Sequence, residues 1–221
     1  MSEKYGEIPP KFTKDWWSYF WMYYKWHTIG ISAAVIAVAG TAVQCAHREK
    51  YDLAVTYCAQ SYMDPETEEA LELELEKYTD DADGNGEVNV MIQQINISNA
   101  AGSEEMDYAL QVKHDMELSN DYAYLFIYDK TEAEDLIPRE SSDSVYADVR
   151  DWLPDAGDRA VVNSSAEVPS AVSLSGSAIL DSLGIDSEEL YAAVRLNYSE
   201  EDYNAASQRS AIEAARALAA D

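Results

Sequence analysis

The residues best suited to chemistry lie in an acidic, glycine-containing stretch at residues 81–87, which reads DADGNGE. This stretch fits the pattern D-x-[DN]-x-[DN]-G, the first half of a common calcium-binding loop. In that pattern the side chains of Asp81, Asp83 and Asn85 would supply oxygen ligands, which hard cations such as Ca²⁺ prefer. Glu87 would add its main-chain carbonyl oxygen. The sequence therefore marks these four residues as candidate metal ligands.

The second half of the calcium pattern is missing. Its twelfth position is Ile92, where such loops carry a bidentate glutamate, and a predicted strand follows instead of a helix. Aspartate, asparagine and glycine also form turns without any ion, because their side chains bond the nearby backbone. The sequence favours such a turn, with calcium as the alternative, and it indicates no other cofactor.

Patterns that would indicate catalysis are poor in this sequence. The three histidines, His27, His47 and His114, have no spacing typical of a metal site. Residues 175–177 (SGS) lack the full G-x-S-x-G pattern of a nucleophilic serine, and no phosphate-binding glycine loop is present. We therefore expect a protein that is not an enzyme, with an uncharacterised enzyme as the weakest alternative.

Charge is distributed unevenly along the 221 residues, whose formal net charge is −27. Residues 1–50 carry six Lys or Arg and four Asp or Glu, whereas residues 51–221 carry nine and 38. Such an acidic domain repels phosphate backbones, so we expect no nucleic-acid partner. The surface charge also keeps the domain soluble without any specific cation function.

The elements that would position the acidic loop alternate between strands and helices. Asp64 and Pro65 begin a helix, as a capping side chain followed by proline at the first helical position. Period-two and aromatic runs predict strands at 51–58, 88–97, 122–128, 171–174 and 190–197. Helix-type spacing of apolar residues and capping residues predict further helices at 103–118, 131–137, 178–183 and 199–220. Residues 139–167 are expected to be irregular. This order predicts one α/β domain at 51–221, with three layers and a mainly parallel sheet.

The sequence before this domain predicts a membrane segment. Residues 28–46 contain no formal charge, and a helix of that length just crosses a ~30 Å hydrocarbon core. Eight of the twelve residues at 16–27 are Trp, Tyr or Phe, which favour the headgroup level. We therefore predict a short cytoplasmic tail at 1–15, and an aromatic interfacial segment with a transmembrane helix at 16–47.

Basic residues near this segment predict its orientation. Four lysines and the amino terminus precede the uncharged run, whereas Arg48 and Lys50 follow it. This excess places the N-terminus inside and the domain outside the cell membrane. A cleaved signal peptide is the alternative, but residues 42–46 show no clean cleavage pattern, so we favour an uncleaved signal anchor.

Two stretches of the domain resemble a known family. Residues 120–129 (NDYAYLFIYD) and 172–186 (VSLSGSAILDSLGID) are similar to parts of a single lobe of extracellular, periplasmic type 2 solute-binding proteins. The N-terminal segment resembles the anchor of uncharacterised single-span proteins of Gram-positive bacteria. The resemblance implies the α/β fold of one lobe and an extracytoplasmic setting. The domain has about half the length of a two-lobed binding protein, so the resemblance assigns no binding residues.

Together these observations predict a single-pass bacterial membrane protein with an acidic extracytoplasmic domain. Its expected role is that of a non-catalytic binding or accessory module for a small solute. The alternative is a structural subunit of a cell-envelope complex, in which residues 16–26 pack against a partner membrane protein.

Overall fold

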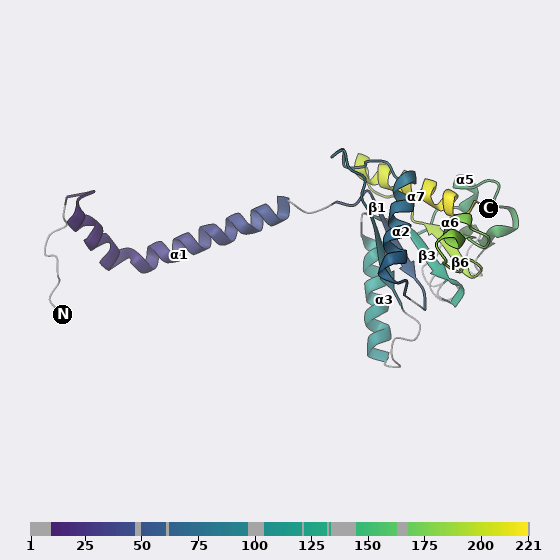
Figure 1. Ribbon diagram of the computed structural model, residues 1–221, viewed down its shortest axis with the longest axis horizontal. Coiled ribbons are helices and arrows are strands. Elements are labelled where there is room, and N and C mark those ends of the chain that lie inside the picture. The colour runs from purple at the N-terminus through teal and green to yellow at the C-terminus, as the bar shows by residue number, and fades with distance from the viewer. Residues whose placement is uncertain are drawn as a thin grey trace. The chain divides into compact units, whose positions relative to one another are not determined.

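The computed structural model describes residues 10–46, 50–60, 62–96, 104–120, 122–131, 133, 145–162 and 168–220. The chain divides into two units, residues 1–49 and residues 50–221. The first unit contains one long helix and the second contains a sheet with its covering helices (Figure 1).

The first unit is the helix α1, Lys14–Ala46. Thr13 begins it, because its hydroxyl accepts a hydrogen bond from the backbone N–H of Trp16. Aromatic rings one turn apart stack along the helix, as between Trp16 and Phe20. No helix in the described part of the chain is both long and apolar enough to cross a membrane. The predicted transmembrane segment is therefore not shown, and it extends over residues 42–46, whose side chains lie outside the described part.

The second unit is built on a six-stranded sheet with the order β2-β1-β3-β6-β5-β4. Its strands are β1 (Leu53–Cys58), β2 (Val90–Ile95), β3 (Ala123–Asp129), β4 (Ala160–Val162), β5 (Pro169–Ser173) and β6 (Leu190–Val194). Strand β1 is parallel to both of its neighbours, β2 and β3. The other three pairings are antiparallel. The unit is therefore α/β with a mixed sheet.

Helices lie on both faces of this sheet. The α-helices are α2 (Pro65–Leu75), α3 (Glu104–Ser119), α5 (Val149–Trp152), α6 (Ala178–Ser182) and α7 (Asp202–Leu218), with 3-10 turns η1 (Glu76–Tyr78) and η3 (Gly157–Arg159). Leu71 of α2 and Ala211 of α7 pack with Leu125 in one apolar cluster. Leu110 of α3 packs with Phe126 in the other. Consecutive strand residues point to opposite faces, so α2 and α7 cover one face and α3 covers the other.

Most predicted elements form where the sequence places them. Asp64 caps α2, because its Oδ1 accepts the N–H of Glu66 and of Thr67, each at 3.1 Å. The structure adds β4, which lies in the stretch expected to be irregular. Most of the helix predicted at 131–137 lies outside the described residues.

The prediction of a mainly parallel sheet is wrong. Strands β4 and β5 are separated by only six residues, too few for the crossover that parallel neighbours require, so they pair antiparallel. Strand β6 enters the sheet beside β3, with Phe126 opposite Ala193. The composition of a strand does not show whether a partner far away in the sequence runs parallel or antiparallel to it. The alternation of strands and helices in the first half of the unit therefore does not predict the pairing of the later strands.

Candidate functional site

The acidic loop connects η1 to β2, and its side chains fold back onto its own backbone. The Oδ1 atom of Asp81 accepts hydrogen bonds from the N–H of Gly84 at 2.7 Å and of Asn85 at 3.1 Å. Its Oδ2 atom accepts the N–H of Gly86 at 2.8 Å. Gly84 and Gly86 have φ values of 72° and 89°, a region that favours glycine. The residue pattern therefore forms the Asx and glycine turn that the sequence favours.

The next two candidate ligands continue the same network. Asp83 accepts the N–H of Asn85 at 3.0 Å on Oδ1 and its amide Nδ2 at 3.0 Å on Oδ2. Asn85 in turn accepts the N–H of Glu87 at 2.7 Å. The hydrogen bonds from Gly86, and then from Gly84 and Asn85, hold the pKa of Asp81 below its usual value. The turn thus satisfies its own polar groups.

Sequence reasoning missed one member of this cluster, Asp52. Its side chain is fully buried at the start of β1. Its Oδ1 accepts the N–H of Ala82 at 2.7 Å and its Oδ2 accepts the N–H of Asn89 at 2.8 Å. The carboxylates of Asp52, Asp81 and Asp83 offer oxygens that all lie within 4.8 Å of one another. The signal in the sequence was an acidic residue near the start of the strand predicted at 51–58.

The donor set therefore has the right chemistry for a hard cation, but a different membership from the predicted one. Asp81 and Asp83 come together, with Asp52 as the third carboxylate. Asn85 and Glu87 take part in the turn through the bonds given above. Each of the three carboxylates already accepts backbone hydrogen bonds, so the loop is complete without an ion. The ion-free turn therefore stays the favoured interpretation of this loop, with calcium binding as the alternative.

A second site lies where the end of α3 meets the residues that follow β6. A pocket of about 450 Å³ opens there. Its walls are contributed by Leu118, Ser119, Tyr124, Arg195, Leu196, Asn197, Tyr198 and Ser199. Small-molecule sites commonly have volumes of about 300–1,000 Å³, so the pocket has a suitable size for a small solute.

Arg195 is the charged group of this pocket, and its side chain is only 8% exposed. Its Nη1 atom donates to the carbonyl oxygen of Leu118 in the last turn of α3. Its guanidinium group lies 4.6 Å from the centre of the Tyr124 ring. The Nε atom is buried and has no acceptor among the described residues. Long-range packing therefore creates a buried cation that no spacing in the sequence indicates.

Neighbouring polar groups fix the rim of the pocket. The hydroxyl of Tyr124 donates to Oδ1 of Asn197 at 3.1 Å. The same oxygen accepts the N–H of Ser199 at 2.8 Å. The backbone N–H of Arg195 donates to the carbonyl of Tyr124 at 2.8 Å. The pocket wall is therefore held in place from β3 and from the chain after β6.

A third cluster of polar side chains is completely buried. His114 of α3 bonds through Nε2 to the hydroxyl of Tyr128 at 2.9 Å, and that hydroxyl lies 2.7 Å from the hydroxyl of Tyr146. His114 has no exposed surface. This chain joins α3, β3 and the segment before α5. Because it is sealed from solvent, we assign it to the core.

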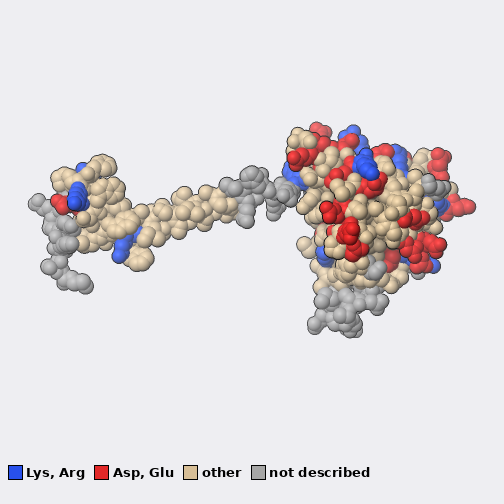
Figure 2. All heavy atoms as spheres, in the orientation of Figure 1, with Lys and Arg blue, Asp and Glu red and all other residues tan. Residues whose placement is uncertain are grey.

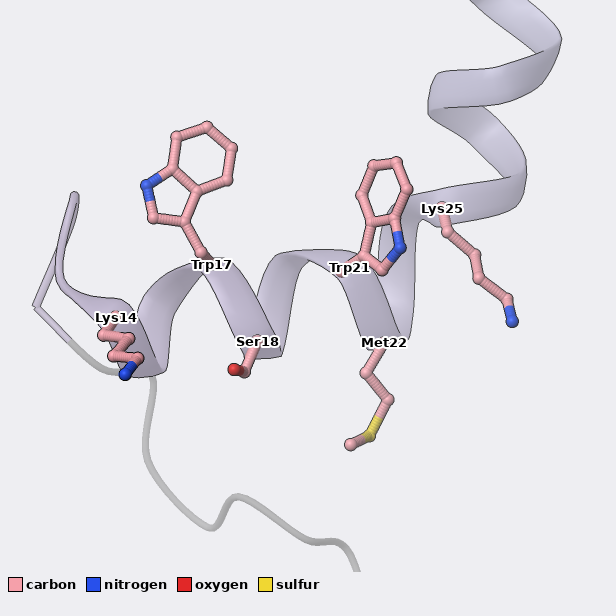
Figure 3. A pocket seen from close by; sticks show the side chains of 6 residues that line it. All are labelled: Lys14, Trp17, Ser18, Trp21, Met22 and Lys25. Atoms are coloured by element: carbon pink, nitrogen blue, oxygen red, sulfur yellow. The ribbon is translucent and has the colours of Figure 1, made fainter.

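A further surface depression lies on α1 alone and is lined by Lys14, Trp17, Ser18, Trp21, Met22 and Lys25. Figure 3 shows Trp17 and Trp21, one turn apart, projecting to the same side of the helix, while Met22 projects elsewhere. A single helix supplies every wall, so this surface is open and does not enclose a solute.

Comparison of the chain with family models, curated proteins and solved structures found no match.

Proposed function

We propose that this chain is a membrane-anchored, extracytoplasmic, non-catalytic binding or accessory module of the solute-binding type. The observation that carries the anchor is the exposure of the apolar side chains of α1. A helix that is hydrophobic on all sides needs an apolar environment, from a bilayer or from other protein.

The apolar exposure of α1 extends along most of its length. Trp26 is 73% exposed and Ile36 is 71% exposed, and other large exposed side chains are Trp17, Trp21, Met22, Tyr23, Tyr24, Ile29, Ile31, Val35 and Val38. Consecutive helical residues differ by about 100° in direction, so this set covers several faces of the helix. Figure 2 shows few charged atoms on this unit and many acidic atoms on the visible face of the other.

The aromatic first half of α1 supports a position at the membrane interface. Trp17 and Trp21 lie between Lys14 and Lys25, an arrangement in which rings and ammonium groups both reach the headgroups. We propose that the uncharged residues after Lys25 continue into the bilayer. The excess of lysines before the uncharged run supports an inside N-terminus and an outside domain.

Vesicle flotation tests the anchor. The full chain and residues 50–221 are mixed with vesicles of neutral phospholipid and centrifuged in a density gradient. We expect the full chain to float and the second unit to stay at the bottom, because only α1 exposes a long apolar surface. Extraction at alkaline pH then separates a membrane span, which stays with the lipid, from a helix held only at the surface. A full chain that stays at the bottom of the gradient contradicts the proposal.

The alternative is that α1 packs against partner membrane helices as a structural subunit. Gly30 and Gly40 are suitable positions to test this alternative, because a Cβ atom added at either position meets no atom of the chain within 4 Å. Leucine at these positions is therefore harmless to the isolated helix. Loss of a co-purifying membrane protein in Gly30→Leu, with flotation retained, would support the subunit role over the solute-binding role.

The binding half of the proposal rests on the second unit. Its pocket of about 450 Å³ has the size of a small-solute site, and its acidic surface disfavours nucleic acids. The groups that surround this pocket also restrict the chemistry of the solute.

A further inference from the structure

The pocket beside α3 contains a cation in an otherwise strongly acidic unit. Residues 51–221 carry nine basic and 38 acidic residues, so most cations there have carboxylates available as partners. Arg195 is buried, yet it forms no ion pair with any carboxylate in the described part of the chain. A buried charge is costly unless other groups compensate it.

Part of this compensation is visible. The carbonyl of Leu118 lies at the C-terminal end of α3, where the helix dipole is negative and favours a cation. The ring of Tyr124 presents its electron-rich face to the guanidinium group. Both contacts orient Arg195, but neither neutralises its charge.

The remaining donors of Arg195 have no acceptor within the described residues. Nε is buried and unpaired, and no described group accepts a hydrogen bond from Nη2. Because Nε is sealed from solvent, Nη2 is the donor that a ligand can reach, and its charge-assisted N–H bond suits a carboxylate. Ser119 and Ser199 also line the pocket and make that part of its wall polar.

The remaining residues of the wall indicate that the rest of the ligand is apolar. Leu118, Leu196 and the aromatic ring of Tyr198 give the pocket an apolar portion. The acidic surface of the unit repels each negative charge of an approaching ligand, so an ion with one charge is favoured over phosphate with two. We infer that this pocket binds, through Arg195, the carboxylate group of a small monocarboxylic acid with an apolar body. This inference rests on the proposed binding role and adds its ligand class.

A ¹H–¹⁵N NMR titration tests the inference on residues 50–221, a unit with its own apolar core. The probes are benzoate and benzamide, which share one shape and differ in charge, with inorganic phosphate as a third probe at constant ionic strength. We expect benzoate to shift the amide signals of Ser119, Tyr124, Leu196 and Ser199. Benzamide should bind about tenfold more weakly, because it cannot accept charge-assisted bonds from Arg195.

Three variants complete the test. Arg195→Gln should weaken benzoate binding by about tenfold or more, whereas Arg209→Gln removes the same charge from an exposed site on α7 and should change nothing. Ser119→Phe fills the pocket with Arg195 intact, and it should also abolish binding. This variant keeps the test valid if Arg195→Gln disturbs the fold, which its amide spectrum reveals.

Several outcomes would overturn the inference. Equal affinity of Arg195→Gln and Arg209→Gln for benzoate would show that Arg195 does not bind the carboxylate. If phosphate shifts the same signals at a lower concentration than benzoate, the preferred ligand is not a carboxylic acid. Equal binding of benzamide and benzoate keeps a small-solute site and removes only the charge requirement. None of these outcomes involves α1, so the vesicle experiment tests the anchor separately.

Discussion

At the scale of single residues, backbone hydrogen bonds control the charge of the acidic loop. Asp81 receives three N–H groups within five residues of sequence, and this arrangement favours its ionised form. Its folded-state pKa therefore lies below the value of an unfolded chain, about 3.9. A carboxylate of this kind stabilises the fold above the unfolded pKa and loses this contribution as the pH falls through the folded pKa.

The first prediction concerns the loss of that carboxylate. Asp81→Asn should lower the melting temperature of residues 50–221 at pH 7, and the difference from the unchanged protein should shrink as the pH falls below about 4. Thermal denaturation followed by circular dichroism between pH 7 and pH 3 measures both effects. Asp155→Asn is the matched control, because Asp155 is exposed. A constant difference at every pH would show that the charge of Asp81 is not responsible.

The second prediction concerns the ion. Because the turn already satisfies its carboxylates, we expect a millimolar calcium chelator to leave the melting temperature of residues 50–221 unchanged. A rise on adding millimolar Ca²⁺ that disappears in Asp83→Asn would contradict this and establish a calcium site. The same titration with Mg²⁺ is the control, since Mg²⁺ demands a smaller octahedral cage.

At the scale of elements, a chain of hydrogen bonds between buried side chains connects three segments of the second unit. The hydroxyl of Tyr128 stands between His114 of α3 and Tyr146 before α5. Phe126 stacks on Tyr128 along the same face of β3. Three separate segments are therefore aligned by one hydroxyl group.

The third prediction is that Tyr128→Phe destabilises the second unit by about 1–3 kcal/mol, because two buried partners lose a hydrogen bond that water cannot replace. Urea denaturation of residues 50–221 gives the free energy of unfolding. Tyr108→Phe is the control, since Tyr108 lies on α3 and is 69% exposed. Equal stability of the two variants would mean that the chain of hydroxyls contributes little.

At the scale of the whole molecule, the two units differ in the kind of side chain that they expose. The helix α1 exposes many large apolar side chains, whereas the second unit has a closed core and an excess of acidic residues. Self-repulsion among these carboxylates opposes the compact state, and added salt screens it.

The fourth prediction follows from this repulsion. Raising NaCl from about 20 mM to about 500 mM at pH 7 should raise the melting temperature of residues 50–221, because the Debye length falls well below 10 Å. At pH 4, where many carboxylates are protonated, the rise should be smaller. Differential scanning calorimetry measures both. A melting temperature that does not change with salt at pH 7 would show that the acidic groups are too far apart to interact.

Features that depend on near neighbours could be predicted from the sequence. The cap at Asp64, the turn at Asp81 and the uncharged run after Lys25 each need only a few adjacent residues, so their patterns are readable. The positions of most strands and helices also follow, because their hydrophobic periods are local.

Only the tertiary structure decided what depends on distant pairing. It placed β6 antiparallel beside β3, brought Asp52 to the acidic loop, and set Arg195 over the ring of Tyr124. These partners are separated by tens of residues, and no composition or period in either segment specifies the other. The direction of strands and the meeting of side chains are set by the packing of the whole core, so both candidate sites emerged fully only in the folded chain.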